Sequence, residues 1–238
     1  MANGDSALTV EFMARVSPLL SQYIHQLSEN LKNHKPQCVN EIIPAYRSLT
    51  VCFDPLIFEH KIVEEQLEKV IAQSYFNDLL EANETLIKIP VCYQGDFASD
   101  LAFVAETNNL TCEQVIERHT KPTYLVNMLG FLPGFLYLSG LDESLHTARK
   151  AIPALQVEAG AIGIGGGQTG IYPFASPGGW HIIGQTPVKI FKPESDTPFI
   201  AKPMDHIQFV PIDEAEFQRI ARSENEFSGV DISEKNRL

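Results

Sequence analysis

The N-terminal part of the chain alternates between segments with strand periodicity and segments with helix periodicity. Residues 7–12 place apolar and polar side chains alternately, which is the pattern of a half-buried strand. Ser17 and Pro18 then supply an N-cap and a first helical residue. The apolar residues that follow recur at helical spacing on one face; they are Leu19, Leu20, Tyr23, Ile24, Leu27 and Leu31. The pattern therefore predicts a strand followed by an amphipathic helix.

A comparable series of patterns continues to about residue 94. Two β-rich runs are expected at 39–45 and 48–53, joined by a tight turn. A second amphipathic helix begins after Asp54, and a further strand spans 85–91. The apolar face of that helix consists of Ile62, Val63, Leu67, Val70 and Ile71. The order β-α-β-β-α-β is that of a ferredoxin-like domain, which we assign to residues 1–94.

The pattern changes in the second part of the chain. Taken together, the two parts predict an α+β protein. Two short helices are expected from Asp96, and Thr111 with Gln114 forms a capping box for the second. Short β-type runs then follow between Gly and Pro turns, and they read TYLVNML, AIGI, HIIG, VKIF and HIQFVPI. Closely spaced short strands are typical of a barrel or sandwich. We assign this domain to residues 95–222, with a last helix from about Asp213 and a polar tail at 223–238.

Composition and charge narrow the possible partners. The chain has 238 residues, with 18 Lys and Arg against 30 Asp and Glu, which gives a formal net charge of −12. An acidic surface repels phosphate, so neither nucleic acid nor an anionic membrane is an expected partner. The start of the chain lacks the pattern of a secretory signal. The four cysteines form no metal-binding or redox motif, and we expect a cytoplasmic protein without a metal or prosthetic group.

Glycine is unevenly distributed, since twelve of the 15 glycines lie between Gly130 and Gly184. Within this region, residues 129–140 form a loop that is rich in aromatic residues. We predict that this loop docks a partner through Phe131, Pro133, Phe135 and Tyr137. The alternative is an apolar loop that plugs one end of a barrel.

A second glycine-rich segment lies at residues 163–173. It matches G-x-G-x-x-G, but Ile-Tyr-Pro follows where a dinucleotide fingerprint would open a helix, so the match is rejected. Consecutive glycine N–H groups can still form a nest for an anion, with neutral donors from Gln168 and Thr169. The predicted backbone donors are Gly165, Gly166, Gly167 and Gly170. The alternative is a sharp β-turn or bulge that requires positive φ.

A third segment, residues 176–181, places the only tryptophan beside a histidine. Strand alternation sends Trp180 and His181 to opposite faces. His181 is the best candidate for a general acid and base, because its ordinary pKa lies near 6.5. Arg149 and Lys150 are the nearest cations for a carboxylate or phosphate. A structural histidine and a solvated basic pair are the alternatives.

Several of these segments together resemble a known family. LGFLPGFLYLSGL and GGGQTGIYPFASPGGWHIIGQTP are similar to the signature of the 5-oxoprolinase B subunit, a family also called allophanate hydrolase subunit 1 or sporulation-kinase inhibitor. The likeness includes GDSALTVEF, PAYRSLTVCFDP and IPVCYQGDFASDL, and it covers roughly residues 3–212. It implies an N-terminal α/β domain and a C-terminal cyclophilin-like β-barrel. It also implies a C subunit as partner and a third subunit in an ATP-dependent enzyme of the carboxyltransferase-domain type.

The reaction implied by the resemblance converts 5-oxo-L-proline to L-glutamate at the expense of ATP. We expect Gln168 and the Gly165–Gly170 loop to donate to a phosphorylated lactam oxygen, and His181 to assist proton transfer. Arg149 is expected to neutralise the substrate carboxylate. The other expected substrate-binding residues are Thr169, Tyr172 and Ser176. ATP would be a co-substrate at a site that is shared with, or carried by, a partner, and the chain alone is expected to be inactive.

Two other functions are compatible with the resemblance. The protein could regulate a sensor histidine kinase by binding it through the loop at 129–140 and blocking its phosphorylation. It could also be one component of an allophanate- or urea-type amidohydrolase and carboxyltransferase. Prolyl isomerase activity would rest on the cyclophilin-like fold alone. Catalysis of this type relies on an arginine in an aromatic pocket, and the sequence has no arginine between Lys150 and Lys189.

Overall fold

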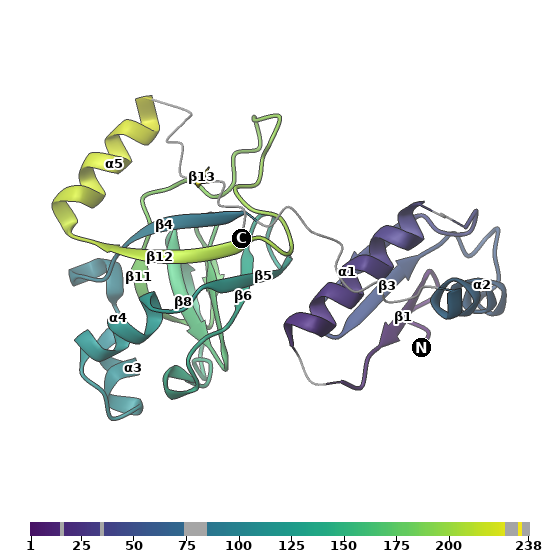
Figure 1. Cartoon of the computed structure of the whole chain (residues 1–238), viewed down its shortest axis with the longest axis horizontal. Coiled ribbons are helices and arrows are strands. Elements are labelled where there is room, and N and C mark those ends of the chain that lie inside the picture. The colour runs from purple at the N-terminus through teal and green to yellow at the C-terminus, as the bar shows by residue number, and fades with distance from the viewer. Residues whose placement is uncertain (15–16, 34–35, 74–84, 227–232, 235–238) are drawn as a thin grey trace. The chain divides into compact units, whose positions relative to one another are not determined.

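The computed structural model divides the chain into two compact units, Met1–Ala82 and Asn83–Leu238 (Figure 1). It describes residues 1–14, 17–33, 36–73, 85–226 and 233–234. None of the helices in these ranges combines the length and the apolar character that crossing a membrane requires.

The first unit packs two helices with a three-stranded antiparallel sheet. Its elements are β1 (Ala7–Glu11), α1 (Pro18–Asn33), β2 (Glu41–Pro44), β3 (Ser48–Cys52) and α2 (His60–Gln73), and the strand order is β1-β3-β2. The predicted helix stripe is mostly correct. Ile24, Leu27 and Leu31 of α1 are fully buried in the core of this unit, whereas Leu19 is exposed.

The predicted ferredoxin-like order of the N-terminal domain is corrected by the structure, because the expected fourth strand belongs to the second unit. This strand, β4 (Leu86–Cys92), pairs in parallel with β12 (His206–Ile212) over seven residues. Ile87, Ile89 and Val91 of β4 point into the core of the second unit. Alternation of apolar and polar residues predicted the strand correctly, but it carries no information about which sheet the strand joins.

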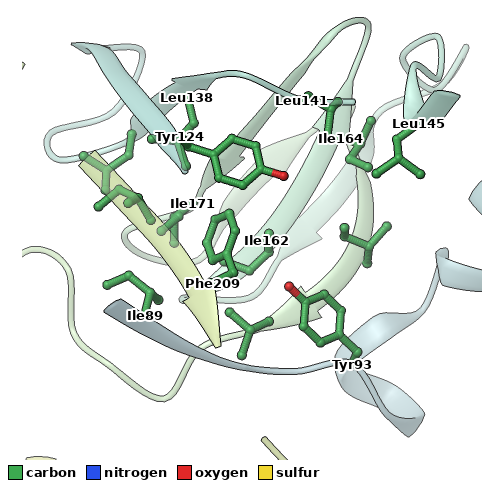
Figure 2. Close-up of a cluster of buried hydrophobic side chains, with 14 of the residues drawn as sticks. Ile89, Tyr93, Tyr124, Leu138, Leu141, Leu145, Ile162, Ile164, Ile171 and Phe209 are labelled. Carbon is green, nitrogen blue, oxygen red and sulfur yellow. The ribbon is translucent and has the colours of Figure 1, made fainter. Parts of the chain in front are cut away.

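The second unit is a closed barrel of seven strands. The strand order is β11-β8-β9-β6-β5-β12-β4, and pairing of Gln185 on β11 with Cys92 on β4 closes the ring. The remaining bounds are β5 (Tyr124–Leu129), β6 (Leu136–Ser139), β8 (Ala161–Gly165), β9 (Gln168–Ile171) and β11 (His181–Gln185). Figure 2 shows side chains from these strands, among them Tyr124, Ile162 and Phe209, pointing together into the barrel interior.

Short helices and a two-stranded ribbon accompany the barrel. They are η1 (Gly95–Ala98), α3 (Leu101–Thr107), α4 (Cys112–Thr120), η2 (Glu143–Leu145), β7 (Ala154–Val157) and β10 (Ser176–Gly178). The predicted capping box at Thr111 and Gln114 is confirmed, with both hydrogen bonds present. The run VKIF is not a strand but lies in a segment joined by a single bridge between Phe191 and Phe199.

The final helix is also confirmed as α5 (Glu214–Glu226), and it extends past the expected start of the tail at residue 223. Within the tail, β13 (Ser233–Glu234) pairs with β4. The other tail residues beyond α5 lie outside the described ranges.

Candidate functional site

A cavity of about 540 Å³ opens beside α3 in the second unit. Its wall combines Asp100 and Phe103 from the start of α3, the segment 147–152, and His181 from the first position of β11. Three of the residues that the sequence singled out, Arg149, Lys150 and His181, therefore lie in one cavity. A cavity of this volume is large enough for a small organic molecule.

His181 is held rigidly in the cavity wall. Its Nε2 atom lies 3.0 Å from the carbonyl oxygen of Ala148. Because a carbonyl oxygen can only accept, Nε2 carries the proton and the neutral imidazole keeps a lone pair on Nδ1. The ring also stacks on Phe103, with centroids 4.6 Å apart. The Nδ1 atom is buried and has no hydrogen-bond partner within the part of the chain that the structure describes, so His181 retains an unused proton acceptor.

Arg149 and Lys150 present their charges differently. The guanidinium carbon of Arg149 lies 5.7 Å from the centre of the Trp180 ring, and no carboxylate of the described residues pairs with it. Lys150 instead forms an ion pair with Asp100 at 2.7 Å. A cation over an aromatic face is held in place without losing its charge to a counter-ion. Arg149 is thus available for an incoming anion.

The glycine-rich segment forms a hairpin between β8 and β9. Gly165 and Gln168 are paired residues, and Gly166 has a φ of 66°, as the first central position of a type II′ turn requires. The N–H of Gly166 donates to the carbonyl oxygen of Thr147 at 2.7 Å. At least one of the four predicted backbone donors is therefore already used within the fold. The segment has the geometry of the sharp turn that was the alternative interpretation.

Three glycines around this hairpin make room for Trp180. A Cβ atom at Gly165 would lie 2.5 Å from the indole ring, and a Cβ atom at Gly163 or Gly170 would lie 3.0 Å from Trp180 atoms. Trp180 packs on the outer face of the barrel with Phe135 and Tyr172. Close packing of a large ring against backbone explains why glycines are concentrated on these strands.

Thr169 points into the barrel interior instead of toward a ligand. Its hydroxyl donates to the carbonyl oxygen of Gly163, so it must accept from Nε2 of His119, 3.0 Å away. The other ring nitrogen of His119 then accepts from the hydroxyl of Tyr93 at 2.8 Å. These bonds form one chain in which every buried polar group is satisfied while His119 is neutral.

His119 was not singled out by the sequence analysis. It lies at the end of α4, is fully buried, and stacks on Phe209 with centroids 4.6 Å apart. Burial lowers the pKa of His119 to about 3 and holds the pKa of Tyr93 well above its usual range. A histidine that stays neutral at physiological pH and is sealed from solvent contributes to stability instead of exchanging protons with a ligand.

The remaining predicted residues divide between the outer face and the core. Tyr172 and Ser176 are buried, and the hydroxyl of Ser176 donates to the carbonyl oxygen of Pro177. In the predicted docking loop, Phe131 and Pro133 are exposed, Tyr137 is half-buried and Phe135 is 1% exposed in the aromatic cluster. The structure therefore unites Arg149 with His181 but places Gln168 outside the residues that line the cavity. The roles proposed for Gln168, Tyr172 and Ser176 stay predictions.

Comparisons with known proteins agree with this architecture. The family model described as carboxyltransferase domain, subdomain C and D, matches residues 1–201. The B subunit of 5-oxoprolinase from Bacillus subtilis (strain 168) is 36% identical over 93% of this chain and 96% of its own length. The protein of the same name from Escherichia coli O157:H7 is 39% identical over 87% of this chain and 93% of its own length.

A more distant similarity is visible in the fold of a solved structure. The crystal structure of the urea amidolyase of K. lactis matches 92% of this chain with a TM-score of 0.79 and 20% identity. The match covers 15% of that chain. The same fold therefore also occurs as one part of a much longer protein.

Proposed function

The chain belongs to the carboxyltransferase domain, subdomain C and D, family, and on this premise we propose that it is the B subunit of an ATP-dependent 5-oxoprolinase. The relatives from B. subtilis and E. coli carry the name of such a subunit, and this chain spans nearly their whole length. The observation that carries the proposal within the structure is the cavity in which Arg149 and His181 meet.

The proposed reaction opens the lactam of 5-oxo-L-proline. The γ-phosphoryl group of ATP is transferred to the lactam oxygen, which makes the carbonyl carbon open to attack. Water then attacks this carbon and the C–N bond breaks, which leaves an acyl phosphate of glutamate. A second water attacks the acyl carbon, and phosphate leaves with the former lactam oxygen. The products are L-glutamate, ADP and phosphate. Each step needs groups that hold the substrate and move protons.

The residues of the cavity suit the second half of this reaction. Arg149 neutralises the substrate carboxylate, because its charge is unpaired among the described residues and its position is fixed over Trp180. His181 assists proton transfer between the attacking water and the departing ring nitrogen, and its Nδ1, which is buried in the isolated chain, becomes accessible when the complex assembles. The carbonyl oxygen of Ala148 supports this role by fixing the imidazole tautomer.

We place ATP at a site that is shared with, or carried by, a C subunit, and we include a third subunit in the complex. The names of the relatives, each of which specifies a B subunit, support the existence of other subunits. Gln168 and the Gly165–Gly170 hairpin are proposed to face this partner and donate to the phosphorylated oxygen. The chain alone is proposed to be inactive.

Substitutions at the cavity should affect turnover by the assembled complex in different ways. For His181→Gln we expect kcat to fall by about 100-fold or more, because proton transfer by a positioned side chain contributes about 10²–10⁴-fold. For Arg149→Met we expect mainly a higher KM for 5-oxoproline. Glutamate release by the complex, reconstituted with its partner subunits, is the measurement.

The exposed Arg222→Met on α5 serves as a matched control and should leave both parameters unchanged. Gln168→Ala tests the hairpin role separately, and it should lower kcat. Unaltered kinetics in both Arg149→Met and His181→Gln would overturn the assignment of the site. Absence of ATP-dependent glutamate release from the wild-type complex would overturn the proposed function itself.

Docking of the partner gives a further prediction. Phe131 is 65% exposed and Phe135 is 1% exposed, so only the first can contact another subunit without unfolding the loop. We expect Phe131→Ser to weaken binding of the C subunit by about tenfold or more, because buried aromatic residues dominate interface energies. Calorimetric titration with the C subunit measures this. The similarly exposed Leu19→Ser in the first unit is the control, and equal losses in both variants would contradict a docking role for the loop.

A further inference from the structure

Asp100 occupies an unusual position at the start of α3. It is the N-cap residue of this helix, yet its side chain makes no capping hydrogen bond. Its Oδ2 atom instead accepts from the N–H of Ile182 and from Nζ of Lys150, both at 2.7 Å. An aspartate at this position normally stabilises its helix by capping it. Here the carboxylate is directed toward the cavity wall.

The contacts of Asp100 fix the wall of the cavity. Its backbone N–H donates to the carbonyl oxygen of Ile182, so α3 and β11 are joined by two hydrogen bonds at this point. The backbone N–H of Lys150 donates to the carbonyl oxygen of Gly179. Lys150 is thereby held at both ends, by its main chain and by its ammonium group. Its side chain is 23% exposed, so the pair is sheltered but open to the cavity.

Lys150 can bind a second anion without releasing Asp100. An ammonium group has three N–H donors in different directions, and the ion pair with Asp100 occupies one of them. Arg149, the adjacent residue, lines the same cavity. The charges of Arg149, Lys150 and Asp100 leave the cavity with one net positive charge, in a chain whose formal net charge is −12. A local positive charge of this kind attracts small anions.

We propose that Lys150 is a second carboxylate-binding residue of the cavity and that Asp100 is the positioning residue that holds it there. The inference rests on the proposed function, since it assigns Lys150 to the carboxylate of the same lactam substrate. Arg149 and Lys150 bind the carboxylate from two directions, while the flat face of the substrate lies against the apolar part of the wall at Phe103 and Ile152. The lactam ring is then oriented relative to His181.

The test compares Lys150→Met with Lys150→Arg in the assembled complex. We expect Lys150→Met to raise the KM for 5-oxoproline at least tenfold with kcat changed less than threefold, because a contact made equally in the bound and transition states alters KM alone. Lys150→Arg should restore most of the affinity. Asp100→Asn keeps an acceptor for Ile182 but weakens the hold on Lys150, and it should raise KM to an intermediate value. Lys121→Met, on the exposed end of α4, is the control.

A lactam without the carboxylate separates binding from a general structural effect. 2-Pyrrolidinone has the same ring as 5-oxoproline and no carboxylate, so its inhibition constant should be the same in wild type and in Lys150→Met. An equal loss of affinity for both compounds would overturn the proposal, as would an unchanged KM for 5-oxoproline. If the wild-type complex does not turn over 5-oxoproline, the proposed function fails instead, and the two failures are therefore distinguishable.

Discussion

Between pH 7 and pH 4, the barrel with His119→Gln is expected to lose about 3 kcal/mol less unfolding free energy than the wild-type barrel. In the wild type, His119 is fully buried and neutral, and its pKa is lowered to about 3, whereas an unfolded chain binds a proton on histidine near pH 6.5. Glutamine can keep both hydrogen bonds of the chain, with its oxygen accepting from Tyr93 and its nitrogen donating to Thr169, but it does not titrate.

The sign follows from which state binds the proton. Above pH 6.5 neither state is protonated at this position, and the full stability is present. As the pH falls from 6.5 toward 3, only the unfolded state takes up the proton, so the free energy of unfolding decreases by about 1.4 kcal/mol per pH unit. Stacking of a protonated ring on Phe209 would return about 2 kcal/mol as a cation–π interaction, which is less than the full penalty.

The single tryptophan makes the measurement specific to the barrel. Trp180 lies in the second unit, so its fluorescence during urea unfolding reports on that unit without a contribution from the first. Urea unfolding at pH 7 and pH 4 gives the two free energies for wild type and variant. Hydrogen bonds from Ser144 lower the pKa of Asp142. Protonation of acidic groups of this kind also destabilises the folded state in acid, but it does so equally in wild type and variant.

Replacement of the exposed His146 by glutamine is the matched control and should leave the wild-type pH dependence in place. Equal losses of stability between pH 7 and pH 4 in wild type and in His119→Gln would show that His119 takes up its proton over the same pH range in the folded state as in the unfolded state. The hydrogen-bond chain through Tyr93 and Thr169 would then need a different proton arrangement.

The sequence predicted those features that depend on nearby residues. The capping box of α4 joins residues three positions apart, and both of its bonds are present. The buried stripe of α1 follows from helical spacing in the same way. Membership of a sheet does not follow from local spacing. The strand β4 pairs with β12, whose residues lie 120 positions later in the chain, and this pairing moved the strand out of the N-terminal unit.

The candidate site shows the same contrast between what nearby residues reveal and what depends on contacts between distant residues. Arg149 and His181 were selected from the sequence because of their chemistry, and the structure brings them to one cavity. Asp100 was missed because its partners, Lys150 and Ile182, are 50 and 82 positions away and no local motif marks it. The buried His119 was missed because residue type alone does not distinguish a histidine inside a barrel from one on its surface.

The glycines give the second large expected effect: Gly170→Ala should destabilise the barrel by about 3 kcal/mol. A Cβ atom there would lie 2.6 Å from the carbonyl oxygen of Leu136 and 3.0 Å from both Phe135 and Trp180. The carbonyl belongs to β6, which pairs with β9 at this point, so it cannot move without disturbing the sheet. The urea midpoint of Trp180 fluorescence should fall by roughly 1–2 M.

This prediction separates the two explanations of the glycine-rich segment. If the glycines served only to expose backbone donors to an anion, Gly170→Ala would weaken ligand binding and leave the stability of the free chain unchanged. If they make room for Trp180 and the backbone of β6, the loss appears without any ligand. Gly179→Ala is the control, because its Cβ atom would lie 3.7 Å from Pro153 at ordinary contact distance, and its stability should change by less than about 1 kcal/mol. Equal stability of Gly170→Ala and Gly179→Ala would reject close packing as the reason for the glycines.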